Sequence, residues 1–458
     1  MPGAEVDVVV IGMGPGGEDV GARLARAGLR VVGVDGRLVG GECPYYACIP
    51  TKIMVRATDA LGEARRATRL AGAVDVTPDW APVAKRIREE ATDNWDDTVA
   101  VERFESAGGR FVRGWGKITA PREVTVSTPE GERVFTAGKG IVLNTGTDPA
   151  VPAVDGLAET PYWTNRDAVA VEEVPGSLIV LGGGPVGCEL AQVFSRFGAT
   201  VTVVQHADRL VPVDEPEAGE LLEKVFAAEG ITVRTGLSAA RVSFESGQFT
   251  VKLDNGEVVS AERLLVAAGR HTDMAALGVG AVGLDESARG VSVDERMRAA
   301  DGLWAIGDIT GRGAFTHMSM YQARIAAADI LGEEDAETAD YRATPRVTFT
   351  DPEIGSVGLS EAAARARGLT VRVGLSELPS SSRGFIHKLG NDGFIKVVED
   401  ADRGVLIGAT AAGPAGGEIL GALVVAVHAE VPTKLLRQMI YAYPTFHRAI
   451  EDALSKLA

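Results

Sequence analysis

The sequence predicts an α/β fold with two nucleotide-binding parts, followed by a C-terminal α+β domain. Two glycine-rich segments, at residues 12–17 and 182–187, each follow a short apolar strand and precede a helix. From residue 345 the composition changes to short strands and helices of the kind found in antiparallel α+β domains. A chain of 458 residues also has the length of about three domains, at roughly 150 residues each.

The composition is acidic and rich in apolar residues. Hydrophobic residues make up 45% of the chain, and 46 Lys+Arg stand against 63 Asp+Glu, for a formal net charge of -17. An acidic protein repels phosphate backbones and anionic lipid, so we expect no nucleic-acid partner and no membrane association. The first 17 residues lack the pattern of a signal peptide, and the apolar run 419–427 is too short to span a bilayer. We therefore expect a cytoplasmic protein.

The first βαβ unit carries a full dinucleotide fingerprint. A predicted strand at residues 6–11 ends at the turn GMGPGG, a helix covers residues 18–27, and a strand at residues 30–34 ends at Asp35. The glycines permit a tight turn beside a pyrophosphate, and a carboxylate about 20 residues further on can bind ribose hydroxyls. The alternative is a glycine-rich turn without a ligand. Strand, helix and carboxylate together favour a bound dinucleotide.

Residues 40–52, GGECPYYACIPTK, place two cysteines five positions apart directly after this unit. In an ideal helix such side chains point in different directions, so a disulfide between Cys43 and Cys48 needs a bent backbone, which Pro44 and Pro50 favour. The chain has only one other cysteine, too few for a disulfide framework, and the pair lacks further metal ligands nearby. A redox-active pair is favoured and no metal is expected. Two buried thiols that never meet remain the alternative.

The next segments complete the first domain. Residues 51–107 are predicted to form helices interrupted near residues 76–82, and residues 111–134 to form a β-meander. A short strand at residues 141–143 then leads into the turn NTGTDP. A glycine and a proline at this point suit a chain that leaves one domain for another.

A second βαβ unit repeats the fingerprint, so we expect two dinucleotides. A strand at residues 178–181, the turn GGGPVG, a helix through residue 197 and a strand at residues 200–204 follow one another. The second strand is followed by Gln205 and His206 instead of a carboxylate. Loss of the carboxylate removes repulsion from a 2'-phosphate, which His206 can approach, and this favours NADPH. In the alternative both residues are simply surface residues and NADH serves equally well.

The remaining segments predict further strands and a third domain. A strand at residues 264–268 ends at Gly269, and a strand at residues 303–306 ends at Gly307-Asp308. The C-terminal strands are predicted at 347–350, 354–359, 394–398 and 405–409, and the helices at 361–367, 417–428 and 433–440. The predicted domains are 1–150, completed by 271–340, then 151–270, and finally 341–458.

These motifs together resemble the class I flavoprotein disulfide reductases, which include dihydrolipoamide dehydrogenase, glutathione reductase and mercuric reductase. The family usually reads GGTCLNVGCIPSK where this chain reads GGECPYYACIPTK. The resemblance covers essentially the whole chain. It implies two Rossmann-like dinucleotide-binding domains, the first for FAD and the second for NAD(P)H, plus a C-terminal α+β dimerisation domain and hence a homodimer.

The resemblance also implies roles for single residues. Cys48 would lie next to the flavin, Cys43 would attack the substrate, and Lys52 would lie near the flavin and pair with Glu189. FAD would bind at Gly12, Gly14, Gly17, Asp35, Lys52, Gly116, Thr145, Gly146 and Asp308, and the nicotinamide dinucleotide at Gly182, Gly184, Gly187, Gln205, His206 and Gly269. A nicotinamide gives a hydride whereas thiol exchange needs a thiolate, so a flavin is expected to connect the two.

The chain departs from the family at the C-terminal motif. That motif resembles HAHPT followed by a glutamate, whereas this chain reads YAYPTFHR from residue 441 to residue 448. A phenol with a pKa of about 10 is a poor base near neutral pH, where an imidazole near 6.5 is well suited. We therefore expect Tyr443 to donate a hydrogen bond, with positive potential from Arg448 and from a helix starting near Pro444. On such a helix His447 would share a face with Tyr443, which makes it the alternative base.

The sequence thus predicts an enzyme that passes electrons from NAD(P)H through FAD to a Cys43-Cys48 disulfide and on to a small thiol, disulfide or other electrophile. One alternative is a diaphorase-like reductase of quinones or metal ions. Another is an enzyme like 2-ketopropyl-coenzyme M oxidoreductase/carboxylase, which also lacks the His-Glu dyad. A non-enzymatic alternative is a subunit of a larger assembly.

Overall fold

Residues 4–458 are described by the computed structural model, and they divide into two compact units. The first unit holds the described residues up to Pro50 together with Lys85–Ala150 and Arg270–Asp340. The second holds Thr51–Ala84, Val151–Gly269 and Tyr341–Ala458. Within residues 4–458, no helix is both long enough and apolar enough to cross a membrane.

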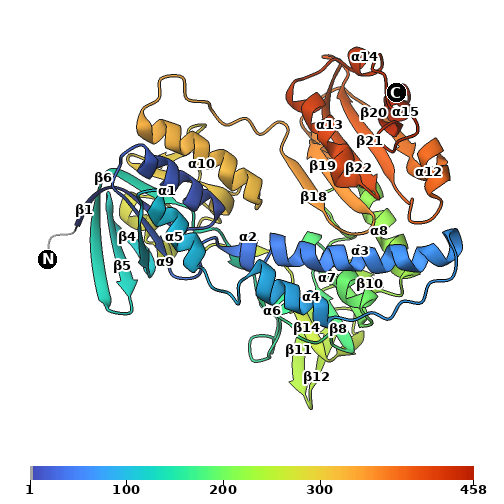
Figure 1. Cartoon of the computed structure of the whole chain (residues 1–458), viewed down its shortest axis with the longest axis horizontal. Helices are drawn as coiled ribbons and strands as arrows, with labels where there is room; N and C mark the ends of the chain where they lie inside the picture. Colours follow the sequence, from blue (N-terminus) through green and yellow to red (C-terminus); the bar gives the residue numbers. More distant parts are fainter. Residues whose placement is uncertain (1–3) are drawn as a thin grey trace. The chain divides into compact units, whose positions relative to one another are not determined.

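A mostly parallel sheet forms the centre of the first unit, in the order β16-β17-β6-β1-β2-β3. Its strands are β1 (Ala4–Ile11), β2 (Val31–Asp35), β3 (Arg110–Arg113), β6 (Gly131–Leu143), β16 (Arg298–Ala300) and β17 (Leu303–Ala305). Strands β4 (Trp115–Ala120) and β5 (Glu123–Thr128) form an antiparallel meander with the first half of β6. Helices α1 (Pro15–Arg26) and α10 (Thr316–Leu331) lie side by side against this sheet (Figure 1).

The burial of β1 explains why its sequence is an unbroken apolar run. Val8, Val9 and Val10 are fully buried, as expected for a parallel strand that is covered on both faces. The smaller helices of the unit are α2 (Glu42–Tyr45), α5 (Thr98–Ser106) and α9 (Met274–Leu277), and a π-helical turn covers Arg86–Ala91. A two-stranded ribbon, β7 (Asp148–Pro149) with β15 (Arg270–His271), joins the segments where the chain leaves this unit and returns to it.

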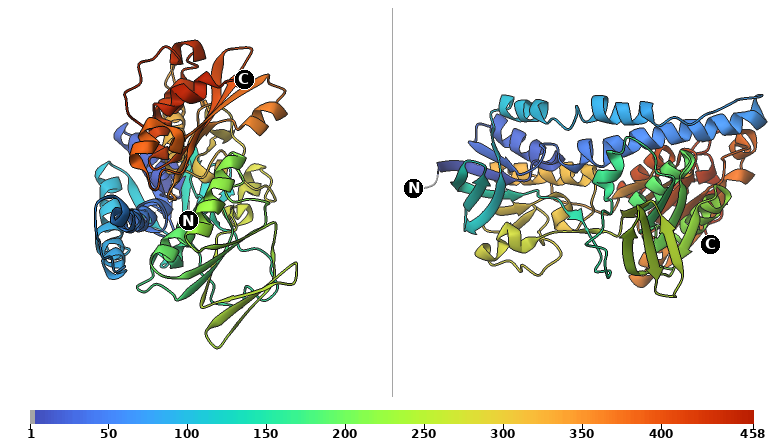
Figure 2. Two further views of the ribbon diagram at one scale, coloured as in Figure 1. Left: turned by 90° about the vertical axis from the view of Figure 1, so that its right-hand side faces the viewer. Right: turned by 90° about the horizontal axis from the view of Figure 1, so that it is seen from below.

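The second unit contains a four-stranded parallel sheet in the order β10-β9-β8-β14. Its strands are β8 (Ser177–Leu181), β9 (Thr200–Gln205), β10 (Thr232–Thr235) and β14 (Arg263–Val266), with helices α6 (Asn165–Val169), α7 (Pro185–Arg196) and α8 (Pro216–Ala228). A separate antiparallel sheet consists of β11 (Ala239–Glu245), β12 (Gln248–Leu253) and β13 (Val258–Ala261). Helix α3 (Cys48–Leu70) appears in Figure 2 as one long helix, and the short helix α4 (Ala81–Lys85) follows it.

The C-terminal part of this unit is a five-stranded antiparallel sheet in the order β18-β19-β22-β21-β20. The strands are β18 (Pro345–Thr348), β19 (Glu353–Gly358), β20 (Val371–Glu377), β21 (Phe394–Asp400) and β22 (Val405–Gly413). Helices α13 (Gly416–His428) and α15 (Ala449–Ser455) contribute apolar side chains such as Leu420, Leu423 and Leu454 to its core. Three shorter helices, α11 (Glu361–Ala366), α12 (Ser382–His387) and α14 (Thr433–Leu436), complete it.

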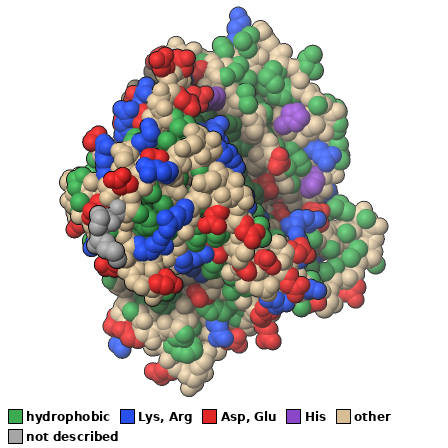
Figure 3. All heavy atoms as spheres, turned by 60° about the vertical axis from the view of Figure 1, so that its left-hand side comes forward, with side chains coloured by type: hydrophobic (Ala, Val, Ile, Leu, Met, Phe, Trp, Pro, Cys, Tyr) green, Lys and Arg blue, Asp and Glu red, His purple; other side chains and the backbone are tan. Residues whose placement is uncertain are grey.

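The predicted fold class is confirmed: two parallel βαβ sheets and a C-terminal antiparallel α+β sheet are present. The domain boundaries remain predictions. Acidic and basic side chains are interspersed over the face that Figure 3 presents, so the net charge of -17 is not gathered there in one field.

Some predicted elements differ from the observed ones in extent. The strand predicted at residues 141–143 is present as the end of the longer strand β6, in which Gly140 can pass close to the Gly302 carbonyl because it has no side chain. The helix predicted over residues 433–440 ends at Leu436, whose carbonyl accepts a hydrogen bond from the buried Tyr441 hydroxyl. Strand β20 was not predicted.

Candidate active site

The first glycine-rich turn is packed so closely that only glycine fits at its key positions. Gly12 has a φ of +91°, and a methyl group there would lie 2.3 Å from the Asn144 carbonyl oxygen. A methyl group at Gly17 would lie 2.0 Å from the Gly12 carbonyl oxygen. The Asn144 amide fastens the turn by donating to that same Gly12 oxygen at 3.1 Å, and it accepts from Ser319 Oγ at 2.9 Å.

Asp35 holds the turn from the end of β2. Its Oδ2 accepts a hydrogen bond from Met13 N at 2.7 Å, and its Oδ1 accepts one from Arg37 N at 2.7 Å. Burial raises the pKa of this carboxyl, and the two backbone hydrogen bonds oppose that shift. Each carboxylate oxygen has a second lone pair, so Asp35 can also accept from a ribose hydroxyl.

The residues beyond the turn fit the rest of an FAD molecule. Thr145 Oγ1 is buried and finds no hydrogen-bond partner within the described residues, so a bound ligand would satisfy it. Thr147 Oγ1 donates to Asp308 Oδ2 at 3.0 Å, and Arg270 Nε lies 3.9 Å from the same oxygen. Burial raises the pKa of Asp308, and Arg270 opposes that rise.

Two further glycines of the expected FAD site stand at less crowded positions. A methyl group at Gly116, on β4, would lie 3.1 Å from Ile11 Cγ2, so the strand approaches β1 closely. Gly146 adopts a φ of +64° directly after Thr145. Together with the orphaned Thr145 hydroxyl, this glycine-lined cradle fits a dinucleotide such as FAD.

The second fingerprint repeats the architecture of the first with a neutral side chain. Gly182 has a φ of +116°, and methyl groups at Gly182 and Gly187 would lie 2.2 Å and 1.9 Å from backbone oxygens. Gly184 is the N-cap of α7, as Gly14 is of α1. Gln205 Oε1 accepts from Gly183 N at 3.0 Å. The Gln205 amide therefore holds this turn as the Asp35 carboxylate holds the first.

Two further side chains of interest, His206 and Arg209, follow Gln205 at the same strand end. His206 is exposed, and its Nδ1 lies 2.8 Å from Ser238 Oγ. Arg209 Nε is buried and unsatisfied by any of residues 4–458. Gly269, which ends the adjacent segment, has a φ of +123° and open space around its Cα.

The two cysteines lie on different helices that are separated by a bend. Cys43 belongs to α2, and Cys48 is the first residue of α3. Between the two helices, Tyr46 N and Ala47 N both donate to the Glu42 carbonyl at 2.8 Å, which bends the chain. Both cysteines are half-buried. The predicted bend is therefore present, and the pairing of the two thiols remains a prediction.

Cys48 has a polar neighbour, and Tyr45, which lies between the two cysteines in the sequence, is buried. Thr316 Oγ1, at the start of α10, lies 3.4 Å from Cys48 Sγ. The Tyr45 hydroxyl donates to the Asp96 carbonyl at 3.3 Å, and burial, with help from Asp97, raises the pKa of Tyr45 to about 12. Tyr45 therefore stays neutral at working pH. Residues 4–458 contain no group of three or more His, Cys, Asp or Glu side chains suited to a metal ion.

Lys52 and Glu189 form a direct ion pair within the second unit. Lys52 Nζ lies 2.6 Å from Glu189 Oε2, and the Glu189 side chain is only 5% exposed. Glu189 Oε1 accepts from Phe349 N at 2.9 Å, and the Lys52 ammonium lies 4.6 Å from the centroid of the Phe349 ring. The structure thus brings these two residues together, while their catalytic role remains a prediction.

The C-terminal motif has one structural tyrosine and one exposed tyrosine. Tyr441 is 6% exposed and belongs to the core of the C-terminal sheet, whereas Tyr443 is 68% exposed. Arg448 Cζ lies 5.7 Å from the centroid of the Tyr443 ring, and Arg448 Nη1 pairs with Glu451 at 2.9 Å. Tyr443 is therefore the member of this motif that can meet another molecule.

The expectation of a helix starting near Pro444 is wrong. Helix α15 begins at Ala449, so Tyr443 and His447 do not share a helical face. His447 Nε2 instead lies 3.5 Å from Thr445 Oγ1, and its ring packs 6.4 Å from that of Tyr441. The helical positive potential expected at Tyr443 is absent as well, because the segment 440–448 is not helical in the described chain.

Several residues of the site carry no sequence signal of their own. Asn144, Thr316 and Phe349 act through contacts with segments that are more than 100 residues away. The only available signal was position: Asn144 directly precedes the predicted Thr145-Gly146 turn. Arg270 follows the predicted Gly269 turn in the same way.

Comparisons with known proteins find matches along nearly the whole chain. The family described as pyridine nucleotide-disulphide oxidoreductase matches residues 6–324, and its dimerisation domain matches residues 344–454. A dihydrolipoyl dehydrogenase of Chlorobaculum tepidum is 32% identical over 459 residues, which cover 98% of this chain and 96% of that protein. A mercuric reductase of Shewanella putrefaciens is 29% identical, over 96% of this chain and 78% of that protein.

Solved structures of two further proteins share the fold. The Cu(II) complex of the HOCl-induced flavoprotein disulfide reductase RclA from Escherichia coli has a TM-score of 0.86 and 25% identity, over 98% of this chain and 99% of that one. LpdA from Mycobacterium tuberculosis has a TM-score of 0.85 and 25% identity, over the same shares of the two chains.

Proposed function

This chain belongs to the pyridine nucleotide-disulphide oxidoreductase family, and from that premise we propose that it reduces a small disulfide or other electrophile through Cys43 and Cys48. As a family member it is an enzyme that uses FAD and NAD(P)H, and its dimerisation domain indicates a homodimer. FAD, when bound, accepts a hydride from the nicotinamide and passes two electrons to a disulfide. For a disulfide substrate the balance is NAD(P)H, one proton and the disulfide giving NAD(P)⁺ and two thiols.

One observation carries this proposal: the two cysteines sit on separate helices on either side of a bend. Cys48 opens the 23-residue helix α3, and its sulfur touches the Thr316 hydroxyl at 3.4 Å. A helix N-terminus and a hydroxyl donor both favour an anionic sulfur. Cys43, on the short helix α2, is then the thiol that attacks the substrate.

The Lys52–Glu189 pair supports the reduced state in this proposal. The buried Glu189 carboxylate holds Lys52 in place, since it lies 2.6 Å from the ammonium. A fixed cation near the reacting groups favours electron-rich species. The lysine therefore stabilises negative charge, and it is not required to transfer a proton.

Tyr443 stands where the family motif has a histidine, but its phenol cannot act as the base that an imidazole would be. Its phenol is exposed and next to the Arg448 guanidinium, 5.7 Å from the ring centroid. We propose that Tyr443 donates a hydrogen bond to a substrate, while Cys43 loses its proton to solvent. Turnover should then follow a thiol pKa and be slow with ordinary disulfides such as lipoamide or oxidised glutathione.

NADPH is the proposed electron donor. Gln205 is a neutral amide, so it presents no negative charge to a 2'-phosphate. Its oxygen accepts a hydrogen bond from Gly183 N. Arg209 adds a positive group at the same strand end, and His206 adds an imidazole that can hydrogen-bond to a phosphate. A charge-assisted hydrogen bond of ~1.5 kcal/mol would give about a tenfold preference in kcat/KM. An equal or greater preference for NADH would contradict this assignment.

The experiment that tests the thiol route is a Cys43→Ser variant. Reduction of a disulfide substrate by NADPH should be lost, whereas reduction of an artificial quinone by bound FAD should persist. Undiminished turnover of the disulfide in Cys43→Ser would show that electrons leave by another path.

Reduction of copper is the second candidate, because an RclA structure that matches this chain is a Cu(II) complex. Cu(II) would be a substrate here and not a resident cofactor. Two Cu(II) ions would accept the two electrons of one NADPH. Formation of Cu(I), followed with a Cu(I)-specific chelator in wild type and Cys43→Ser, tests this candidate.

A further inference from the structure

A buried charge network in the second unit fixes the backbone segment that touches both members of the Lys52–Glu189 pair. That segment runs from Phe349 to Asp351, between β18 and β19. Its first residue gives its backbone N–H to Glu189 Oε1 at 2.9 Å and places its ring 4.6 Å from the Lys52 ammonium. A shift of this segment would therefore disturb the carboxylate and the ammonium together.

Two residues of α7 clamp the other end of the segment. Gln192 Oε1 accepts from Asp351 N at 2.8 Å, and Gln192 Nε2 donates to Asp351 O at 2.9 Å. Arg196 Nη2 lies 2.8 Å from Asp351 Oδ2. Glu189, Gln192 and Arg196 are spaced by three and four positions, so they share one face of α7. One helix face thus holds both the ion pair and its support.

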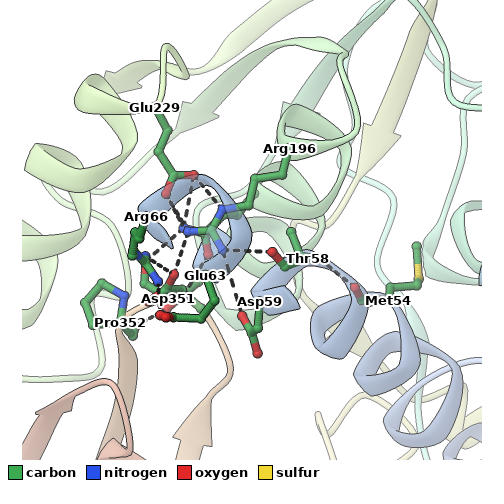
Figure 4. A network of polar contacts seen from close by, with 11 residues as sticks. Met54, Thr58, Asp59, Glu63, Arg66, Arg196, Glu229, Asp351 and Pro352 are labelled. Carbon is green, nitrogen blue, oxygen red and sulfur yellow. Dashed lines mark hydrogen bonds and ion pairs between the residues drawn. The ribbon is translucent and has the colours of Figure 1, made fainter. Parts of the chain in front are cut away.

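The network extends to α3, as Figure 4 shows. Arg66 pairs with Asp351 Oδ2, which therefore lies between two guanidinium groups. Arg196 Nη1 also lies 3.3 Å from the Thr58 carbonyl and 3.9 Å from Asp59 Oδ1. Lys52 and Asp59 on α3 are seven positions apart, as are their partners Glu189 and Arg196 on α7. The two helices therefore run in the same direction and are joined at both positions.

The charge of Asp351 is the centre of this arrangement. Burial alone would raise the pKa of its carboxyl, but Arg196 and Arg66 outweigh burial and lower it. Arg196 is only 4% exposed, and its second carboxylate partner is Glu229, at 2.5 Å. Glu229 contacts Arg196 and Gln192, which are both on α7 and outside the segment 349–351. Asp351 and Glu229 thus share the same arginine, and Asp351 alone belongs to the segment.

We propose that Asp351 is a positioning residue that, through the Phe349–Asp351 segment, holds Glu189 against Lys52. The inference rests on the proposed function, in which this pair stabilises the reduced site. Loss of the Asp351 charge lets the segment move, lengthens the contact between Glu189 and Lys52, and frees the ammonium to solvent. The Lys52 amine then reacts faster with acylating reagents. In turnover, kcat falls by a larger factor than KM rises.

Competitive acylation of lysines in the holoenzyme, read by mass spectrometry, tests the proposal. The exposed Lys85 serves as the internal reference amine. Asp351→Asn should raise the labelling rate of Lys52 by about three- to thirtyfold relative to Lys85, a change within the range measured for coupled contacts. Glu229→Gln is the matched control: it removes a carboxylate from the same arginine, and Lys52 labelling should stay within about twofold of wild type.

A double-mutant cycle separates positioning from mere loss of stability. In a Glu189→Gln background, Asp351→Asn should have no further effect on Lys52 labelling, because the contact it supports is already gone. If the Asp351→Asn effect persists undiminished in that background, or if Glu229→Gln raises labelling equally, the proposal is overturned.

Arg66→Gln provides a milder second variant if Asp351→Asn does not fold, since it leaves Arg196 on Asp351. It should raise Lys52 labelling in the same direction, by about two- to threefold, and unchanged labelling would count against the proposal. The result is independent of the thiol route. Loss of disulfide turnover in Cys43→Ser can be observed whether or not Asp351 controls Lys52, so the two ideas fail separately.

Discussion

Asp59 carries a carboxyl group whose ionisation opposes folding, so its removal should stabilise the protein at neutral pH. Burial raises its pKa from 3.8 to about 6, Asp351 adds to the shift, and Arg196 opposes it. Between these two values the folded state binds more protons than the unfolded state. The free energy of unfolding therefore falls as pH rises through that window, and the full cost is present above it.

The magnitude follows from the shift and the exposure. About two pKa units correspond to ~3 kcal/mol. The side chain is 42% exposed, however, so solvent screening reduces this to about 1 kcal/mol. Asp59→Asn should raise the free energy of unfolding by about 1 kcal/mol well above the window and leave it unchanged below the window. Urea denaturation at one pH on each side of the window measures both values.

Asp285→Asn is the control for this experiment. Side-chain and backbone hydrogen bonds from Ser287 lower the pKa of Asp285, so its carboxylate favours the folded state and its removal should bring no gain. The reasoning would be refuted if Asp59→Asn destabilised the protein at neutral pH, or if its gain were the same on both sides of the window.

Three further predictions concern the cofactor, the core and the proton. Gly12→Ala should weaken FAD binding by more than about tenfold, because its methyl group would lie 2.3 Å from the Asn144 oxygen. Flavin absorbance after gel filtration measures this loss. Gly28→Ala is the control and should retain FAD, because Gly28 has a φ of +90° but open space around it. Lys396→Met should lower the free energy of unfolding in urea by about 3 kcal/mol. The reason is that the Lys396 side chain is only 4% exposed and its ammonium neutralises Glu215, Glu217 and Glu361, at 3.0, 2.7 and 3.1 Å. A loss below about 1 kcal/mol would contradict this reasoning. His447→Ala should leave the pH profile of turnover unchanged, because α15 begins only at Ala449, whereas loss of an ionisation near 6.5 in that variant would identify His447 as the base.

The two fingerprints could be predicted because their physics is local. Gly12 and Gly182 are required where the turn meets a neighbouring strand end, and each is followed by a helix that the sequence already indicates. Asp35 and Gln205 occupy equivalent positions, and both fasten the turn from the end of the second strand. Local spacing therefore predicted these two regions well.

Other features depend on contacts that spacing cannot show. The Lys52–Glu189 pair joins residues 137 positions apart, and only the resemblance to a family suggested it. The segment around Tyr443 was predicted as helical from its proline. It is not helical, because the Tyr441 ring is buried and its hydroxyl donates a hydrogen bond to the Leu436 carbonyl. The Asp351 network was not predicted, because its members come from four separate regions of the chain.

Anaerobic titration of the holoenzyme with NADPH, followed by thiol alkylation and mass spectrometry, tests the central claim most directly. Before reduction, the peptide that contains Cys43 and Cys48 should resist alkylation and weigh two protons less than the dithiol. After one equivalent of NADPH per subunit, both sulfurs should become alkylated together. If both cysteines are alkylated to the same extent before and after NADPH, they do not form a redox disulfide, and the proposed route of electrons through them is wrong.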